Sequence, residues 1–330
     1  MLTKHKNVLI ITALGVLLSG CDWALINPAG DIAAQQSDLI ILSTKLMLLV
    51  VVPVTVLSAV FAWHYRQSNT KATYAPNWCH STSLEIALWT LPLLIIGILG
   101  VITWNTTHSL DPFHPLTRLD ATRPLPANVK PLKVQVVAMD WKWLFIYPEY
   151  GIATVNEVAA PVDVPISFDI TSTSMMNALS IPALAGMIVV VPGMQGQLHA
   201  VVNRAGNYAG LAGNYSGAGF SDMKFRFLGL SQKDFDDWIA KAKSGGNTLG
   251  RPEYLALEKP SVREPVRRYS SVAAGLYDAI LNRCVVSGTK CKRDMIANDT
   301  RSGSELALRQ PTCNTRIGAL SDAPVPVANN

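Results

Sequence analysis

Two long apolar runs lie in the first third of the chain. Leu46–Trp63 contains no charged residue, and Ile86–Trp104 is a second run of the same kind. Each run is long enough for an α-helix to cross roughly 30 Å of hydrocarbon, whereas the alternative, a buried hairpin in a large soluble core, usually has shorter runs. We therefore expect two membrane helices, over residues 39–64 and 85–104, with a connecting loop over residues 65–84.

The pattern changes after the second run. Residues 105–130 are rich in Pro and Thr, which is typical of an extended linker. Over residues 131–229, short apolar runs alternate with Gly, Pro and Asn at regular spacing, a pattern that predicts a β-sandwich or barrel. The expected strands are Leu132–Met139, Ala153–Val158, Ile166–Thr171, Met187–Val191, Gln197–Val202 and Met223–Leu228.

A small helical extension is expected after the sandwich, over residues 230–284. In Leu230–Ala242 the apolar residues fall on one helical face, and Ser231 is placed to cap the helix. Val266–Leu281 is a second amphipathic segment. Residues 285–330 are polar and end in a Pro-rich stretch, so we expect a tail without regular structure.

Composition and charge agree with a membrane protein. Hydrophobic residues make up 49% of the chain and charged residues only 15%, whereas soluble proteins have about 25% charged residues. The net charge of +5 is modest, and no basic stripe with interleaved aromatic residues is present, which argues against nucleic acid as a partner. Arg66 and Lys71 lie in the loop between the spans, whereas the N-terminal segment, residues 21–38, contains no Lys or Arg. This bias places the loop in the cytoplasm and the large domain in the periplasm.

The N-terminus has the three parts of a secretory signal peptide, predicted over residues 1–20. A basic start is followed by the apolar run Val8–Leu18, and small residues precede Cys21. The Leu-Ser-Gly-Cys sequence resembles the cleavage site of bacterial lipoproteins, in which the cysteine becomes the lipid-bearing N-terminus. The alternative is an uncleaved anchor in which Cys21 has no special role.

The chain has five cysteines and no CxxC pair, which gives little support to a zinc or thioredoxin-like site. Cys284, Cys291 and Cys313 lie in the part expected in the periplasm, where disulfides form. We favour a Cys284–Cys291 disulfide, which closes a short loop, although spacing alone does not decide the pairing. The chain also lacks GxxxxGK[ST], HExxH and GxSxG motifs, so nucleotide-binding, zinc-protease and serine-hydrolase functions are not indicated.

Four local motifs, in a fixed order, carry a family resemblance. They are Glu85–Pro92 (EIALWTLP), Asp140–Trp143 (DWKW), Met176–Leu184 (MNALSIPAL) and the Gly-rich stretch Tyr208–Met223. Together with the two spans, they make the chain similar to subunit II of haem–copper respiratory oxidases over roughly residues 21–245. The resemblance implies a membrane helical hairpin, a periplasmic all-β cupredoxin-like sandwich and, here, a small C-terminal helical extension.

The chain departs from the family at the copper ligands. The family's dinuclear copper centre needs two bridging thiolates, two imidazoles and a thioether, and its main loop reads Cys-x-Glu-x-Cys-x-x-x-His-x-x-Met. Of these ligands only Met223 remains. The other ligand positions are occupied by Asn177, Ala212, Asn214, Ser216 and Phe220. A shifted ligand set is the alternative, but His199 is the only His after His114, and we expect it to be an ordinary strand residue.

The resemblance implies a function for a chain without that centre. Family members that lack it are quinol oxidases, in which ubiquinol gives its electrons directly to subunit I. Subunit I would carry the haems and one copper, and this chain would bind no cofactor and catalyse nothing alone. It would be a structural and assembly subunit of a proton-pumping quinol oxidase in the bacterial inner membrane. Its partners would be subunits I, III and IV and membrane lipids, with no role for cytochrome c.

Glu85 is the one residue expected to take part in chemistry. It opens the second span at the cytoplasmic side, where an ionisable group is costly unless it is used or hydrated. The matching Glu of the family lies at the entrance of a proton pathway into subunit I, and the resemblance implies that role for Glu85. The alternative is an interfacial Glu that simply faces water. Without a copper centre to serve, Trp141 and Trp143 are expected to be packing residues.

Two other functions fit parts of the pattern. One is a copper-bearing cytochrome c oxidase subunit II, which metal analysis separates from a quinol-oxidase subunit. The other is a membrane-anchored periplasmic lipoprotein whose β-sandwich is a binding scaffold, stable and functional alone. Co-purification with a large haem-bearing subunit distinguishes an oxidase subunit from such a scaffold.

Overall fold

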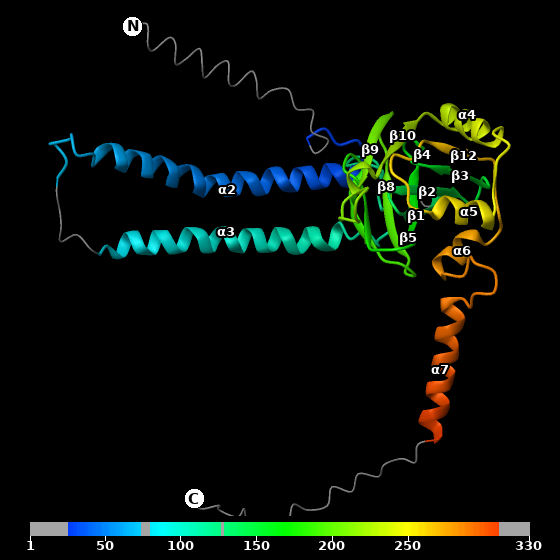
Figure 1. Ribbon diagram of the computed structural model, residues 1–330. Helices are drawn as coiled ribbons and strands as arrows, with labels where there is room; N and C mark the ends of the chain where they lie inside the picture. Colours follow the sequence, from blue (N-terminus) through cyan, green and yellow to red (C-terminus); the bar gives the residue numbers. More distant parts are fainter. Residues whose placement is uncertain (1–25, 74–79, 127–128, 310–330) are drawn as a thin grey trace, which may run out of the picture.

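The computed structural model of the chain describes residues 26–73, 80–126 and 129–309. The predicted signal peptide, the predicted lipidation site Cys21 and Cys313 lie outside these ranges. Two long helices, a β-sandwich and a set of shorter helices follow one another along the chain (Figure 1).

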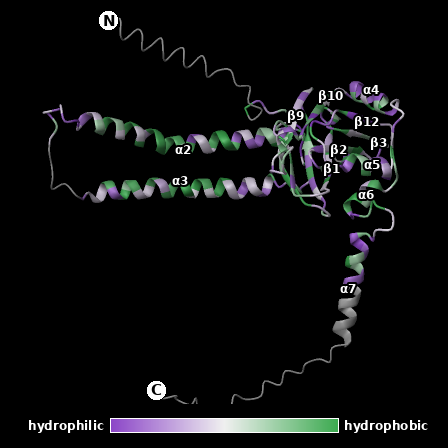
Figure 2. Cartoon of the chain, in the orientation of Figure 1, coloured by the Kyte–Doolittle hydropathy of each residue, from purple (hydrophilic) through white to green (hydrophobic). Residues whose placement is uncertain are grey.

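The two predicted spans are helices. α2 (Asp31–His64) and α3 (Thr82–Ser109) are both long and apolar enough to cross a membrane. They lie side by side and extend from the sandwich in the same direction, with hydrophobic residues along most of their length (Figure 1, Figure 2). Most of their apolar side chains are exposed in the isolated chain, as expected of side chains that face lipid or partner helices.

α2 begins at Asp31, whereas the first span was expected to begin at residue 39, after a separate N-terminal segment. Gly30 is extended and marks the helix start. Asp31 lies at the positive end of the helix dipole, and its carboxylate accepts a hydrogen bond from Arg118 at 2.8 Å. The first turn packs on the sandwich, because Ala33 N–H donates to Leu184 O at 3.2 Å, and just before the helix Ala29 N–H and Gly30 N–H both donate to Ala183 O. Because the first turns of α2 contain several polar residues, the start of the helix cannot be recognised from hydropathy alone.

The sandwich consists of two main sheets. The larger has the strand order β12-β3-β2-β1-β5-β8, with β1 parallel to β5 and antiparallel to β2. Its strands are β1 (Leu132–Met139), β2 (Lys142–Tyr147), β3 (Ile152–Val155), β5 (Pro165–Ser172), β8 (Gly196–Val201) and β12 (Arg267–Tyr269). The smaller has the order β4-β10-β9-β6-β7. Its strands are β4 (Glu157–Pro161), β6 (Asn177–Ile181), β7 (Ala185–Val190), β9 (Gly206–Ala212) and β10 (Lys224–Leu230).

β2 lies between two hydrophobic cores. Trp143, Phe145 and Tyr147 point into the core between the sheets, whereas Leu144 and Ile146 point into a second core beneath the C-terminal extension. Every residue of β2 is buried as a result. A strand buried on both faces lacks the apolar–polar alternation of a one-sided strand, which is why β2 was not among the predicted strands.

The extension matches the prediction only in part. α4 (Gln232–Lys243) is the predicted helix, and the Ser231 hydroxyl accepts a hydrogen bond from Asp234 N–H as its cap. The segment predicted as a second helix, residues 266–281, instead contains β12, the short strand β13 (Ser271–Val272) and only then α6 (Leu276–Leu281). The reason is pairing: β12 adds an edge strand to β3, and β13 pairs with β11 (Thr248–Leu249).

Two further helices were not predicted. α5 (Arg251–Glu258) is short and has Pro in its first turn, a position that proline tolerates well. α7 (Lys292–Arg309) corrects the expectation that the tail from residue 285 has no regular structure. It leaves the sandwich at a wide angle to α2 and α3 (Figure 1).

Candidate functional site

The predicted ligand loop joins β9 to β10 at one end of the sandwich. It includes a short 3-10 helix, Phe220–Asp222. Backbone bonds close the loop: Ala212 N–H donates to Met223 O at 3.2 Å, and Gly213 N–H donates to Ala178 O at 2.8 Å. The second bond ties the loop to β6, which begins at Asn177. The ligand positions from both segments are thereby brought to one place.

Four of the six ligand positions form a buried cluster. Asn177 and Met223 are each 1% exposed, Ser216 is 3% exposed and Ala212 is 5% exposed. The Ser216 hydroxyl donates to Met223 Sδ at 3.8 Å. Met223 is the only one of the six predicted ligand positions that still carries sulfur. Small side chains and the Met223 thioether therefore pack together at these positions.

The other two positions are less buried than these four. Asn214 is half-buried, and its side-chain amide donates to the Met176 carbonyl at 3.2 Å. The Phe220 ring is half-buried and lies edge-on to Tyr215, with ring centroids 5.7 Å apart. Neither side chain offers a donor atom toward Met223.

Trp141 holds the loop in shape. Its indole N–H donates to Ser216 O at 2.9 Å, and its own backbone is left-handed, with φ of 66°. The ring lies against Gly217, whose φ is 104°, and against Gly219. A Cβ on Gly219 would come within 2.4 Å of the indole, so only glycine fits there. The contacts of this one ring with Ser216, Gly217 and Gly219 fix the course of the loop.

The donor chemistry of the cluster does not suit copper. Asn177 Oδ1 is buried without a hydrogen-bond partner, and its amide makes only long contacts of 3.4 Å to Ser172 Oγ and Met175 O. Amide and hydroxyl oxygens are hard ligands, whereas copper electron-transfer sites use thiolate and imidazole. Among the described residues, no group of three or more His, Cys, Asp and Glu side chains is placed to hold a metal ion.

His199 lies on the other sheet. It is in β8, opposite Ser167 of β5, whereas the ligand cluster belongs to the sheet of β6, β9 and β10. Partial burial lowers the pKa of His199 below its usual value, so the imidazole is neutral at neutral pH. The structure therefore does not bring His199 to the ligand cluster.

Glu85 lies in the first turn of α3, at the end far from the sandwich. About half of its side chain is exposed, and Oε1 is 2.7 Å from His80 Nδ1. A carboxylate is stabilised at the N-terminus of a helix, and the His80 imidazole lies within hydrogen-bonding distance of it. His80 was not among the predicted site residues, because its only signal in the sequence is its position five residues before Glu85.

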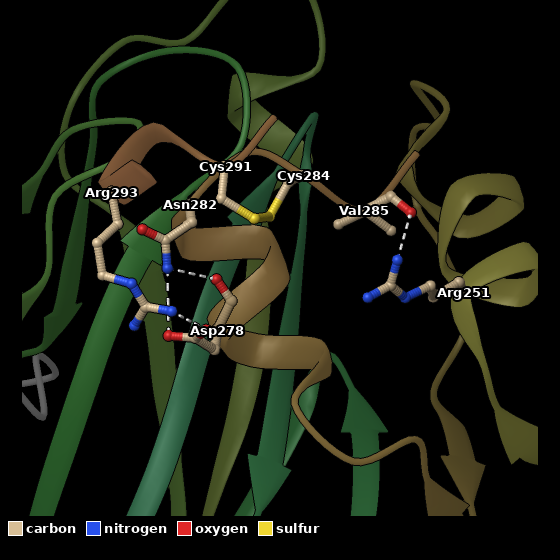
Figure 3. The surroundings of a disulfide bond; sticks show 7 residues. All are labelled: Arg251, Asp278, Asn282, Cys284, Val285, Cys291 and Arg293. Atoms are coloured by element: carbon tan, nitrogen blue, oxygen red, sulfur yellow. Dashed lines mark hydrogen bonds and ion pairs between the residues drawn. A yellow bond between two sulfur atoms is a disulfide. The ribbon is translucent and has the colours of Figure 1, made fainter. Parts of the chain in front are cut away.

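Cys284 and Cys291, the favoured pair, are joined by a disulfide (Figure 3). The bond fixes the loop between α6 and α7. Next to it, Lys292 Nζ donates to Gly193 O at 2.9 Å, and Arg293 lies 3.7 Å from Asp278. The start of α7 is therefore fastened both to α6 and to the turn between β7 and β8.

Two family models match the chain: "Cytochrome C oxidase subunit II, periplasmic domain" over residues 150–227 and "COX Aromatic Rich Motif" over residues 243–288. The cytochrome bo(3) ubiquinol oxidase subunit 2 of Pseudomonas putida is 47% identical over 275 residues, which cover 83% of this chain and 85% of the relative. The ubiquinol oxidase subunit 2 of Acetobacter aceti is 47% identical over 283 residues, which cover 84% and 90%.

One solved structure, the periplasmic domain of subunit II of cytochrome oxidase from Bradyrhizobium japonicum, is 21% identical. It matches with a TM-score of 0.33 and covers 34% of this chain and 94% of that one.

Proposed function

Because the chain belongs to the cytochrome oxidase subunit II family, we propose that it works as subunit 2 of a ubiquinol oxidase in the respiratory chain. Relatives at 47% identity over most of the chain carry that name. The observation that carries the proposal is the copper-ligand cluster, in which alanine, serine and asparagine stand where thiolates and imidazole are needed. Electrons from ubiquinol therefore pass to the haems of subunit I without entering this chain.

The role of the chain in that complex is structural. It is a subunit of an oxidoreductase, placed in the inner membrane by α2 and α3, with its sandwich on the periplasmic side. Subunits I, III and IV are its proposed partners, and a lipid on Cys21 would add a second anchor to the two spans. The backbone bonds between α2 and the sandwich support the structural role, because they fix the domain relative to the membrane.

The electron donor that the purified complex accepts tests this proposal. We expect the purified complex to consume oxygen rapidly with a short-chain ubiquinol and only at the background rate with reduced cytochrome c. The physical reason is that a protein donor needs an acceptor centre within this chain, and the cluster at Met223 lacks the ligands for one. Oxygen consumption driven by reduced cytochrome c at a rate comparable to ubiquinol would refute the proposal.

We also propose that Glu85 admits protons from the cytoplasm. Its place in the first turn of α3, exposed at the membrane edge and 2.7 Å from His80, supports this role. A carboxylate there takes a proton from water and passes it to a partner subunit, and the contact with His80 holds the carboxylate in place.

Replacing Glu85 by Gln is expected to lower ubiquinol turnover of the assembled complex several-fold and to reduce proton pumping. The amide keeps the size and polarity of the side chain but carries no exchangeable acidic proton. Oxygen consumption and proton release by vesicles measure both effects. Glu85→Asp is the matched control and should keep most of the activity. Wild-type rates and pumping in Glu85→Gln would show that Glu85 simply faces water.

A further inference from the structure

The C-terminal extension does not cover the whole outer face of the six-stranded sheet. Along part of that face, α5 and α6 pack on the strands and form the second hydrophobic core. Beside α6 a groove of about 410 Å³ remains between the helix and the strands. Binding sites for small ligands usually have volumes of about 300–1,000 Å³. The groove, here called the α6 groove, is lined among others by Lys133, Gln135, Ile146, Asp169, Leu276 and Tyr277.

The floor of the α6 groove is a row of side chains across three neighbouring strands. Gln135 of β1 lies opposite Ile146 of β2 and opposite Asp169 of β5 in the strand register. The wall consists of the small and apolar residues 272–276, which lead into α6. The groove thus combines polar groups with an apolar surface, as sites that bind a peptide segment do.

Tyr277 brings a hydroxyl group without a partner to the α6 groove. Tyr277 is only 8% exposed, and its hydroxyl makes no hydrogen bond within the described part of the chain. Burial raises the pKa of Tyr277 above its usual value, so the hydroxyl keeps its proton and remains a donor. Because buried hydroxyls nearly always have a partner, this open donor indicates an acceptor that the described residues do not supply.

The charged side chains at the α6 groove already have counter-ions. Lys133 Nζ lies 3.0 Å from Asp169 Oδ2, and Gln197 donates to the other oxygen of that carboxylate at 3.2 Å. At the rim, Arg293 lies 3.7 Å from Asp278 (Figure 3). The groove therefore has no unpaired charge to attract an ion, and the occupant that fits it is an uncharged one with a hydrogen-bond acceptor.

The C-terminal end of this chain has that chemistry. The structure describes the chain as far as Arg309, and residues 323–327, Ala-Pro-Val-Pro-Val, lie beyond it. No charged side chain follows Asp322. Proline has no backbone N–H, so a Pro-rich segment presents carbonyl acceptors that it does not satisfy itself. Grooves that contain aromatic residues are known to recognise segments of this kind.

The chain beyond α7 is long enough to return to the α6 groove. α7 begins next to the groove, because Arg293 in its first turn pairs with Asp278 at the rim. The 18 residues of α7 extend over roughly 27 Å at the usual helical rise. Residues 310–322 span up to about 40 Å when extended. The available chain is therefore longer than the path from the end of α7 back to the groove.

We propose that residues 323–327 of this chain dock in the α6 groove, where a backbone carbonyl of the Pro-rich segment accepts a hydrogen bond from Tyr277. The docked tail is a strap that fastens α6 to the six-stranded sheet and covers the exposed residues Ala274 and Gly275. Because tail and groove belong to one chain, an effective concentration on the order of 1 mM makes weak contacts sufficient. The strap does not depend on which electron donor the complex uses.

Photocrosslinking in the purified complex tests the position of the tail. A photoreactive phenylalanine replaces Ala274, an exposed residue that lines the α6 groove, and in a control chain it replaces Val262, an exposed residue of the extension outside the groove. We expect the Ala274 probe to crosslink to residues 320–330 and the Val262 probe not to. Mixing isotope-labelled with unlabelled complexes separates a crosslink within one chain from one between two copies. A crosslink from Ala274 to a partner subunit or to a second copy, or no crosslink to the tail, would overturn the proposal.

Hydrogen exchange measures the strap without a probe in the groove. We expect the amides of residues 276–281 to exchange several-fold more slowly in the full chain than in a chain that ends at Arg309. Pro324→Ala combined with Pro326→Ala should lose this protection. Pro311→Ala is the matched control, because this proline of the tail lies outside the docking segment, and it should keep the protection. Equal exchange in the full and shortened chains would overturn the proposal.

Tyr277→Phe removes only the hydroxyl group that the proposal uses. Since this hydroxyl has no partner within the described part of the chain, the variant should fold as well as the wild type. We expect Tyr277→Phe to speed exchange of residues 276–281 several-fold in the full chain and to change nothing in the shortened chain. Unchanged exchange in the full chain, or an equal change in both chains, would overturn the assigned contact between Tyr277 and the tail.

Discussion

Replacing Gly30 by Val is expected to uncouple the periplasmic sandwich from the first membrane helix. A Cβ at this position would lie 2.3 Å from Val201 O and 2.8 Å from Leu184 O, and both are backbone atoms that cannot turn aside. The helix start must therefore move, which breaks the bonds from Ala29 and Gly30 to Ala183. Overpacking against backbone costs about 3 kcal/mol or more.

The yield of assembled complex and the thermal unfolding of the sandwich measure this effect. We expect a lower melting temperature and a loss of most of the haem-containing complex for Gly30→Val, with Gly30→Ala intermediate. Gly245→Ala is the control, because a Cβ there meets its nearest atom at an ordinary 3.5 Å. If Gly30→Val matched Gly245→Ala in both measurements, the junction would not be rigid and the structural role of the chain would lose its main support.

Replacing Lys142 by Met is expected to destabilise the C-terminal extension. The buried Lys142 ammonium donates to Leu257 O, Lys259 O and Ser261 Oγ, at 2.8, 2.7 and 2.6 Å. Two of these are carbonyls at the end of α5, where a positive charge also favours the helix dipole. Methionine fills similar space but leaves the buried acceptors unpaired, which costs about 3 kcal/mol.

Chemical denaturation, monitored by the sensitivity of the extension to protease, measures the loss of stability. Ser261→Ala removes only one of the three acceptors and should cost about 1 kcal/mol. A Lys142→Met chain as stable as the wild type would mean that the extension is held by its apolar core alone.

Lys142 also makes the free energy of unfolding depend on pH. Burial lowers the pKa of Lys142 below its ordinary value of 10.5, so the folded chain holds this proton less tightly than the unfolded chain. Its contribution to the free energy of unfolding therefore rises with pH between the folded-state pKa and the ordinary value. The rise should be absent from Lys142→Met in the same denaturation series.

The architecture was predictable wherever it is encoded in local patterns. The two spans follow from apolar run length, and most strands of the sandwich follow from alternation. β9, rich in Gly and Ala, was missed because it lacks the β-branched residues that mark a strand. α5 to α7 depend on pairing and docking contacts far apart in sequence, such as Lys142 with Leu257, which no local pattern contains.

The candidate site was predictable in its residues but not in its geometry. The resemblance identified the ligand positions, from Asn177 to Met223, and the structure brings four of them into one buried cluster. The resemblance could not show that Asn177 Oδ1 is left without a hydrogen-bond partner, or that the Trp141 indole donates to Ser216 O within the loop. Both depend on how β6 and the loop pack together. His80 likewise becomes meaningful only through its distance to Glu85.

The copper content of the purified complex tests the central claim most directly, namely that this chain has lost the copper centre of its family. Copper and haem are measured by mass spectrometry and absorbance in the wild type and in Met223→Leu, which removes the last sulfur ligand position. We predict a single copper per complex, assigned to the partner haem subunit, and the same value in the variant. Two additional coppers in the wild type that disappear in Met223→Leu would contradict the account.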